Sequence, residues 1–321
     1  MTSPYTDALG DHTVMSEPAC PSCSNVRCVA VGDLPTRSFF AGRYLDEPIA
    51  GGRLFRCPEC TLAFRWPVLS DARYLELYDS GCDTHWQDSE IRTDYRLLAR
   101  EIQSSFPCGG SVLDVGCNNG NFLAGLDSRY ILNGIEVNVA AGVSARDRGI
   151  AVWHSVSEVP KETKFDVVTA IDVIEHIRDP RAFLAELIPL LKPHGMLLIS
   201  TGDADNAAWR RVHSRWWYCG IPEHISFISK TWCSHHVTSL GLELGGVRTF
   251  RYLRLPLPRF VLDSVMAATY ACAPSLYLRS MRCVMRVLGK SGDPPIRGVG
   301  LTQDHIFVLL KRLDRDGKNA E

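Results

Sequence analysis

The stretch Ser111-Val-Leu-Asp-Val-Gly-Cys-Asn-Asn-Gly120 places a short apolar run, an acid and a glycine turn in immediate succession. Residues 121–126 then read as the start of a helix. Strand, glycine turn and helix in this order surround a ligand with backbone N–H groups and a helix N-terminus. The turn matches neither G-x-G-x-x-G nor G-x-x-x-x-G-K-[ST], so the dinucleotide and P-loop patterns are absent. Asp114, just before the turn, would repel a pyrophosphate and attract a cationic amino group.

Further strands and helices alternate after this stretch. Helical periodicity covers 88–106, and an Asp179-Pro180 cap predicts a helix running to Leu191. Strands are predicted at 130–137, 151–154, 165–171 and 196–200. A helix capped by Ser229 and stopped by Gly241 comes before two last strands, at 242–250 and 304–311, which we expect to pair antiparallel. The pattern predicts an α/β fold with a doubly wound, seven-stranded sheet and a helical insertion before its last strand.

The chain contains 12 cysteines, and four of them form the knuckles Cys20-Pro-Ser-Cys23 and Cys57-Pro-Glu-Cys60. Two C-x-x-C pairs supply the tetrahedral thiolate set of a structural zinc site, which has no open position for catalysis. The alternative is a small core of reduced, buried cysteines, whereas a redox pair is disfavoured because neither knuckle opens a helix after a strand. The eight others are predicted to be small buried or half-buried residues: Cys28, Cys82, Cys108, Cys117, Cys219, Cys233, Cys272 and Cys283.

The composition of the chain restricts the kinds of molecule that it is expected to bind. The 321 residues hold 35 Lys and Arg against 36 Asp and Glu, which disfavours a general nucleic-acid binder. No apolar run approaches the roughly 20 residues of a membrane span, and the polar first residues lack a secretory signal. A cytoplasmic location is therefore expected. Disulfides are rare in the reducing cytosol, so zinc binding and burial explain the 12 cysteines better than disulfides do.

Four segments resemble the motifs of class I S-adenosylmethionine-dependent methyltransferases, in the right order and spacing. They are 112–122, Gly134-Ile-Glu-Val137, the run from Phe165 to Pro180, and Leu190-Leu-Lys-Pro-His-Gly195. The resemblance implies the seven-stranded Rossmann-like fold and S-adenosylmethionine as the cofactor. One departure is Asn118, which stands where the family has a third glycine and which is tolerated because Asn visits left-handed conformations readily.

The resemblance also implies which residues hold the cofactor. The methionine end would lie against Asp114 and the backbone of Gly116, Cys117, Asn118 and Gly120. Glu136, at the tip of the second strand, would accept the ribose hydroxyls, a role that its distance from the glycine turn also favours; a surface or helix-terminal acid is the alternative. His154, Ser155 and Val156 would flank the adenine, and Asp172 and Ile174 would line the sulfonium end.

A narrower resemblance covers Trp216-Trp-Tyr-Cys-Gly-Ile-Pro-Glu-His-Ile-Ser-Phe-Ile-Ser229. It is similar to a segment of bacterial methyltransferases acting on deoxysugars, glycans and related metabolites, several of which carry an N-terminal four-cysteine zinc module. In sugar C-methyltransferases the Glu-His pair abstracts a proton, and the matching residues here are Glu223 and His224. Those enzymes usually have a second Rossmann-like domain, which this chain lacks, so transfer to a hydroxyl is at least as well supported as transfer to carbon.

These residues lead to a mechanistic hypothesis. His224 is the general base, Glu223 fixes its tautomer, and Tyr218, Trp216 and Trp217 form a wall against a small-molecule or glycan acceptor. The alternative is that Glu223-His224 packs structurally under its loop. Glu175-His176 resembles an acid–base pair but in the family more often belongs to the scaffold.

The domain organisation follows from these segments. The boundaries are a disordered tail at 1–16, a zinc module at 17–67, a helical linker or lid at 68–108, the Rossmann-like core at 109–250, an insertion at 251–300, the last strand at 301–313 and a disordered tail at 314–321. The insertion predicts two amphipathic helices that lid the site, pair two subunits or contact a membrane surface. Monomer and homodimer stay open, as does the acceptor atom. The rival readings are an RNA methyltransferase and a catalytically silent cofactor-binding scaffold.

Overall fold

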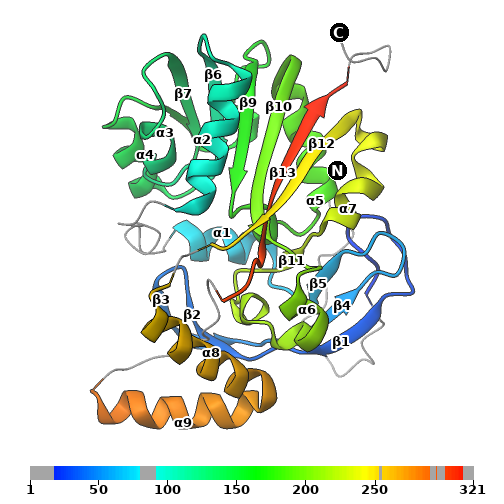
Figure 1. Ribbon diagram of the computed structural model, residues 1–321, viewed down its shortest axis with the longest axis vertical. Helices are drawn as coiled ribbons and strands as arrows, with labels where there is room; N and C mark the ends of the chain where they lie inside the picture. The colour runs from blue at the N-terminus through cyan, green and yellow to red at the C-terminus, as the bar shows by residue number, and fades with distance from the viewer. Residues whose placement is uncertain (1–17, 80–91, 253–254, 290–293, 295–300, 314–321) are drawn as a thin grey trace.

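The computed structural model describes residues 18–79, 92–252, 255–289, 294 and 301–313 (Figure 1). The two predicted disordered tails lie outside the described residues, as do Cys82 and the first residues of the helix expected from 88. The described chain forms one large sheet flanked by helices, a smaller sheet beyond one end of it, and a pair of helices beside that smaller sheet.

The large sheet has seven strands in the order β12-β13-β10-β9-β6-β7-β8, which confirms the predicted fold class. Its strands are β6 Gly110–Val115, β7 Tyr130–Ile135, β8 Ala151–Trp153, β9 Phe165–Ile171, β10 Leu191–Gly202, β12 Leu242–Phe250 and β13 His305–Arg312. The five strands from β10 to β8 run parallel. β13 lies antiparallel between β10 and β12, as we predicted for the last two strands.

Helices cover both faces of this sheet. They are α2 Thr93–Ser105, α3 Asn121–Ala124, α4 Val139–Arg146, α5 Pro180–Leu187 and α7 Lys230–His236. Successive residues of β9 show the two layers: Val167 packs in the apolar cluster with α2 and α3, and Val168 in the cluster with α5 and α7. Because neighbouring strand residues point to opposite faces, the sheet is buried on both sides.

Two helix ends differ from the prediction. The helix capped by Asp179 ends at Leu187 instead of Leu191; a single 3-10 turn, η4 Ile188–Leu190, follows, and β10 starts at Leu191. Pro189 explains the break, since it has no N–H for the next helical hydrogen bond. The helix capped by Ser229 ends at His236, and a 3-10 turn, η7 Thr238–Leu240, leads to Gly241.

The N-terminal segment forms a second sheet that takes one strand from the core. Its order is β1-β4-β5-β11, with the bounds β1 Val29–Asp33, β4 Arg53–Arg56, β5 Ala63–Trp66 and β11 Ser226–Phe227. A hairpin of β2 Arg37–Phe40 and β3 Arg43–Ile49 and the helix α1 Asp71–Asp79 complete this part. Because β11 belongs to the segment after β10, the N-terminal module is joined to the core by a shared sheet. The domain boundary at residue 67 stays a prediction.

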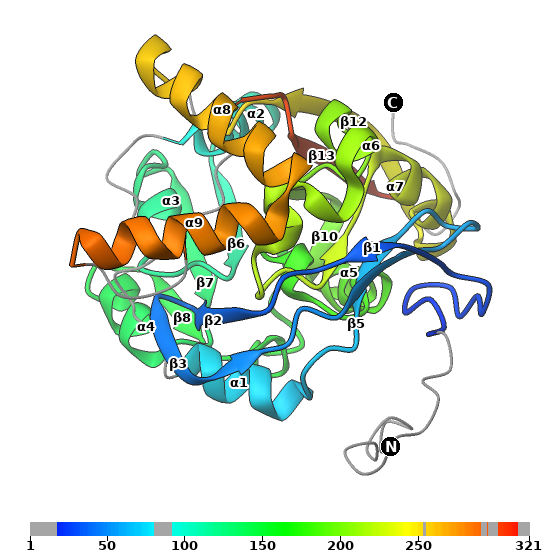
Figure 2. The same cartoon turned by 90° about the horizontal axis from the view of Figure 1, so that it is seen from below.

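The insertion forms two helices, α8 Leu257–Cys272 and α9 Pro274–Val287, as expected. Figure 2 shows them across the same end of the molecule as β1 to β5. This is the end toward which the parallel strands of the large sheet point (Figure 1). Ligands of open α/β sheets bind beyond the carboxyl ends of the strands, so this end contains the candidate site.

Candidate functional site

The glycine turn after β6 has three residues in the left-handed region. Gly116 has φ 74°, Asn118 φ 49° and Gly120 φ 78°, so the asparagine adopts the conformation that the third glycine of the motif would supply. A Cβ on Gly116 would lie 2.5 Å from the Cγ2 atom of Val173, which excludes any larger residue without rearrangement. The turn therefore forms a close-packed backbone cradle between the ends of β6 and β9.

Glu136 closes the second side of this cradle. It follows β7, and its carboxylate accepts hydrogen bonds from the backbone N–H groups of Asn118, at 2.8 Å, and Asn138, at 2.7 Å. Burial raises the pKa of Glu136 although these N–H groups lower it. The carboxylate of Glu136 therefore lies at the edge of the turn, which is the position required by the predicted hydrogen bonds from the ribose hydroxyls.

Asp114 is buried under the same turn. Its Oδ1 atom accepts a hydrogen bond from the Thr169 hydroxyl at 2.6 Å. Burial raises the pKa of Asp114 to about 7, although this hydrogen bond lowers it. A cationic ligand beside Asp114 would favour the ionised form, so this residue fits the amino group of a bound amino acid.

Asp172 stands at the end of β9 with a left-handed backbone, φ 52°. Its Oδ2 atom accepts hydrogen bonds from Arg92 and from the Tyr252 hydroxyl, while Oδ1 is buried and has no partner within the part of the chain that the structure describes. The Arg92 guanidinium lies between two rings, 4.5 Å from the centroid of Tyr95 and 4.7 Å from that of Tyr252. An orphaned buried oxygen at this edge is available to a ligand.

The remaining predicted cofactor residues lie along the same edge. Ile174 and Cys117 are buried, and Ser155 is half-buried just after β8, where its hydroxyl is 2.8 Å from that of Ser157. Backbone hydrogen bonds connect the carboxyl ends of β6, β7 and β8. The N–H of Glu136 donates to the carbonyl of Trp153, and the N–H groups of Gly116 and Cys117 both donate to the carbonyl of Ile135. The structure thus places the predicted residues together at one edge; their contacts with a cofactor stay predictions.

Tyr218 and His224 form a second, buried group beside this edge. The rings of Tyr218 and His224 lie 4.0 Å apart between centroids, and His224 is 5.0 Å from His176. The Tyr218 hydroxyl donates to Glu175 and accepts from the backbone N–H of Gly202 at 3.1 Å. Burial and Asp172 raise the pKa of Glu175 to about 7. Glu175 therefore anchors Tyr218, in keeping with the scaffold role that the family pattern favours.

The predicted contact between Glu223 and His224 is wrong. The Glu223 carboxylate accepts from the backbone N–H of Ala41 at 2.6 Å, whereas Nδ1 of His224 lies 3.0 Å from the carbonyl oxygen of Tyr218. A carbonyl can only accept, so Nδ1 carries the proton and Nε2 of the neutral ring is the basic nitrogen. Residues 221–224 form a turn, in which the N–H of His224 donates to the carbonyl of Ile221 at 3.2 Å, and the two neighbouring side chains leave this turn toward different partners.

The tryptophans of the predicted aromatic wall differ in their surroundings, and their contact with a substrate stays a prediction. Trp216 is 1% exposed and packs with Trp209 and Phe227 in an apolar core, and it also borders a small hollow beside Trp217. Trp217 is half-buried, and its Nε1 donates to Asp304 at 2.9 Å. Sequence reasoning also misplaced Cys108, Cys272 and Cys283, which are exposed.

Arg65 is a functional candidate that the sequence analysis missed. It is 3% exposed, and its guanidinium donates to four carbonyls, those of Gly51, Cys219, Ile221 and His224. Three of these belong to the segment that holds Tyr218 and His224. A single arginine on β5 therefore fixes the backbone of the candidate acceptor site, and no local sequence signal indicates this.

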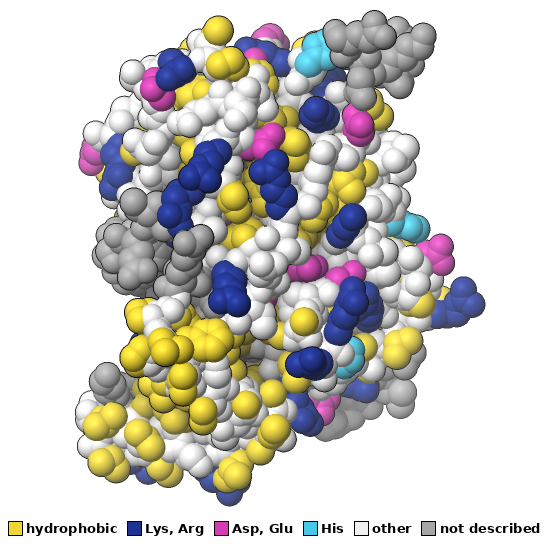
Figure 3. Space-filling model, viewed as in Figure 1, with side chains coloured by type: hydrophobic (Ala, Val, Ile, Leu, Met, Phe, Trp, Pro, Cys, Tyr) yellow, Lys and Arg dark blue, Asp and Glu magenta, His cyan; other side chains and the backbone are white. Residues whose placement is uncertain are grey.

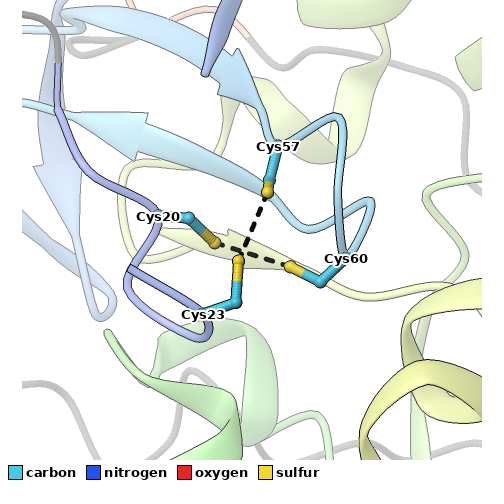
Figure 4. Close-up of side chains that lie close together, drawn as sticks. All are labelled: Cys20, Cys23, Cys57 and Cys60. Carbon is cyan, nitrogen blue, oxygen red and sulfur yellow. Dashed lines mark hydrogen bonds between the residues drawn. The ribbon is translucent and has the colours of Figure 1, made fainter. Parts of the chain in front are cut away.

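The four cysteines of the two knuckles converge as predicted (Figure 4). The sulfur atoms of Cys20 and Cys60 are 3.5 Å apart, as are those of Cys23 and Cys57. Four tetrahedral thiolates at about 2.3 Å from a zinc ion lie roughly 3.8 Å from one another, so the cluster fits that ion. A hydrogen bond from Cys60 lowers the pKa of Cys20 to about 6, which favours a thiolate.

The fold and the edge described above define an α/β protein with a candidate ligand site at the carboxyl ends of its parallel strands. Residues 85–244 match the family model described as "Methyltransferase domain". Residues 85–244 therefore form a methyltransferase domain, and the motifs within it resemble those of the S-adenosylmethionine-dependent class.

Relatives of known name match part of the chain. A ubiquinone biosynthesis O-methyltransferase from Histophilus somni is 34% identical over 115 residues, which is 32% of this chain and 48% of that protein. One from Rhodopseudomonas palustris is 28% identical over 151 residues, 42% of this chain and 58% of that protein. The chain thus spans about half the length of the curated relatives that it matches.

Among solved structures, the N-methyltransferase NodS from Bradyrhizobium japonicum with S-adenosyl-L-homocysteine is 14% identical, with a TM-score of 0.45 over 75% of this chain and 98% of that chain.

Proposed function

We propose that the protein transfers the methyl group of S-adenosylmethionine to a hydroxyl, or a carbon, of a sugar, glycan or small secondary metabolite. The observation that carries the proposal is the cradle formed by the left-handed turn at 116–120, with Glu136 hydrogen-bonded to it and Asp114 buried beneath. Asp114 would hold the cationic amino group of the cofactor and Glu136 its ribose. When bound, the cofactor supplies an electrophilic methyl on its sulfonium.

His224 is the proposed general base. Burial holds the pKa of His224 well below its usual range, so the ring is neutral at pH 7. With Nδ1–H turned to the Tyr218 carbonyl, Nε2 accepts the proton of the attacking hydroxyl. Tyr218 is held by Glu175 and Gly202, which fixes the carbonyl that orients the base. Glu223 is then a positioning residue that ties this segment to Ala41 of the N-terminal module.

The zinc module is proposed to support the acceptor side of the site. Cys20, Cys23, Cys57 and Cys60 would hold a structural ion, whose closed shell leaves catalysis to other residues. Cys57 and Cys60 flank the turn between β4 and β5, and β5 carries Arg65. Metal binding would therefore stabilise the strand that fixes the His224 segment.

The test is turnover with a methyl-labelled cofactor and a panel of nucleotide sugars, glycan fragments and small hydroxylated metabolites. Mass spectrometry identifies the product and the methylated atom. The variant His224→Asn is expected to lose about 10²–10⁴-fold in turnover while cofactor binding is retained. His235→Asn, an exposed histidine on α7, is the matched control. Full turnover by His224→Asn would exclude this base, and failure of calorimetry to detect S-adenosylmethionine binding would favour a different ligand.

A further inference from the structure

The two helices of the insertion carry much of the apolar surface that the protein exposes. Among the described residues fifteen large hydrophobic side chains are exposed, and eight of them belong to α8, α9 and the residue that follows α9. Figure 3 shows hydrophobic side chains gathered over this part of the molecule. The eight, between 48% and 86% exposed, are Leu257, Val261, Leu262, Val265, Leu276, Val284, Val287 and Leu288. A large apolar patch on a folded protein marks an interaction site.

The solvent side of α8 is apolar along the whole helix. Exposed residues without charge recur there at steps of three and four, so they form one stripe. The stripe consists of Leu257, Val261, Val265, Ala268 and Cys272. The two charged residues of α8, Arg259 and Asp263, lie outside this stripe and pair with each other at 2.9 Å. The stripe therefore presents an uncharged surface over four turns of the helix.

α9 has two apolar sides, and one of them is used inside the protein. Tyr277 and Leu278 are buried, and the ring of Tyr277 packs against that of Tyr270 on α8, with centroids 5.7 Å apart. This contact joins the two helices into a hairpin. A second stripe, at steps of four, three and four residues, is exposed and consists of Leu276, Ser280, Cys283 and Val287. The exposed stripe is therefore not needed to hold the hairpin together.

Two arginines border the exposed stripe of α9. Arg279 comes three residues after Leu276, and Arg286 comes three residues after Cys283, so each is a neighbour of the stripe on the helix surface. Both are exposed, and no ion pair joins either of them to an acid in the part of the chain that the structure describes. The stem of an arginine can lie along apolar surface while its guanidinium reaches a polar layer.

We propose that the α8–α9 hairpin docks on an anionic membrane surface. An interfacial helix buries its apolar stripe at the boundary of the acyl chains and is attracted to anionic lipids through its basic residues. The stripes of α8 and α9 supply the apolar face, and Arg279 and Arg286 supply the charge. A second copy of the chain is a poorer occupant. A two-fold contact uses the same surface of both copies, so it would bring their arginines together.

The hairpin lies near the acceptor side of the candidate site. α8 and the short helix α6 Ala207–Val212 both line a hollow of about 230 Å³ that also contains Trp217. Docking would bring this side of the protein to the lipid surface, where an amphiphilic acceptor is concentrated. This consequence rests on the proposed function, whereas docking itself does not.

Flotation of the full chain with lipid vesicles tests the docking of the apolar face. The partition coefficient should be at least tenfold higher for vesicles of phosphatidylcholine and phosphatidylglycerol in equal parts than for phosphatidylcholine alone. Val265→Glu/Val287→Glu places a charge in each stripe and should lower partitioning onto the mixed vesicles at least tenfold. The matched control is Val139→Glu/Val143→Glu, which makes the same change at two exposed positions of α4 and should leave partitioning unchanged.

A second pair of variants tests the charge. Arg279→Gln/Arg286→Gln should lower partitioning onto the mixed vesicles at least fivefold and leave partitioning onto phosphatidylcholine unchanged. Arg100→Gln/Arg148→Gln, which removes two exposed arginines from the core, is the control and should behave like the unmodified protein. Equal melting temperatures of the variants and the unmodified protein show that the changes act on docking and leave the fold intact.

Flotation that needs both phosphatidylglycerol and the apolar stripes supports the proposal. No flotation with the mixed vesicles, or equal flotation of Val265→Glu/Val287→Glu and the unmodified protein, would overturn it. So would a dimer in light scattering that Val265→Glu/Val287→Glu converts to a monomer, because a second copy would then cover the face. None of these readouts depends on methyl transfer, so failure here is distinguishable from failure of the proposed function.

Discussion

The hydroxyl of Tyr218 donates a hydrogen bond to the carboxylate of Glu175, and both side chains are buried. The bond joins the segment after β10 to the turn after β9, two places that belong to the acceptor side and the cofactor side of the proposed site. The pKa of Tyr218 is raised well above its usual value by burial and by Glu175, so the phenol stays protonated and keeps donating.

Replacing Tyr218 by phenylalanine should destabilise the protein. The variant leaves Glu175 with the Thr201 hydroxyl as its remaining side-chain donor, and a buried acceptor deprived of a partner costs about 1–3 kcal/mol. Urea unfolding at neutral pH measures the loss. Tyr44→Phe, at a half-exposed position on β3, is the control and should stay within about 0.5 kcal/mol of the unmodified protein. If Tyr218→Phe and Tyr44→Phe have the same free energy of unfolding, the hydrogen bond between Tyr218 and Glu175 does not stabilise the fold.

Asp114 should make the stability of the ligand-free protein depend on pH. Its folded pKa of about 7 lies above its unfolded value, so its contribution is fully present below about pH 4. That contribution is lost as the pH rises toward about 7, at a slope of up to about 1.4 kcal/mol per pH unit. Asp114→Asn cannot ionise, so the difference in unfolding free energy between it and the unmodified protein should change over this interval.

Denaturant unfolding between pH 5 and 8 supplies the measurement, and Asp147→Asn, at an exposed position after α4, is the control. Parallel curves for the Asp114 variant and the unmodified protein would show that the carboxyl is ionised throughout. Because the cofactor's amino group is cationic, Asp114→Asn should also weaken S-adenosylmethionine binding more than the Asp147 variant does.

The cysteine cluster should hold one zinc ion per chain. Cys57→Ser removes a thiolate from a four-sulfur shell, so the metal content should fall and the melting temperature with it. Metal analysis of the purified protein and thermal unfolding test this, with Cys283→Ser on α9 as the exposed control. Full metal occupancy in Cys57→Ser, or none in the unmodified protein, would refute a four-cysteine zinc site.

Local patterns account for what the sequence predicts well. The alternation of strands and helices, the Asp179 cap, the left-handed Asn118 and the paired knuckles each depend on a few neighbouring residues, and the structure has all of them. These features need no knowledge of distant contacts, because capping, turn geometry and knuckle spacing are properties of short segments.

Contacts between distant segments escaped prediction. Glu223 bonds Ala41, 182 residues away in the chain, and Arg92 bonds Asp172 at a separation of 80. Adjacency in sequence suggested instead that Glu223 serves His224. Partner choice for such groups is set by how the N-terminal module and the segment that begins α2 pack on the core, and one chain's residue pattern does not specify that packing.

Arg65 provides the test of that packing. Arg65→Gln shortens a buried side chain that donates to four carbonyls, three of them in the segment holding Tyr218 and His224. Leaving several buried acceptors without donors should cost roughly 3–5 kcal/mol in unfolding free energy. Because the segment is on the acceptor side, turnover should fall more than tenfold while S-adenosylmethionine binding to the turn at 116–120 is preserved.

The control is Arg53→Gln, an exposed arginine on the neighbouring strand β4. Equal losses of cofactor binding and turnover in Arg65→Gln would mean that the arginine supports the whole fold, whereas unchanged turnover would show that its carbonyl contacts do not position the acceptor segment.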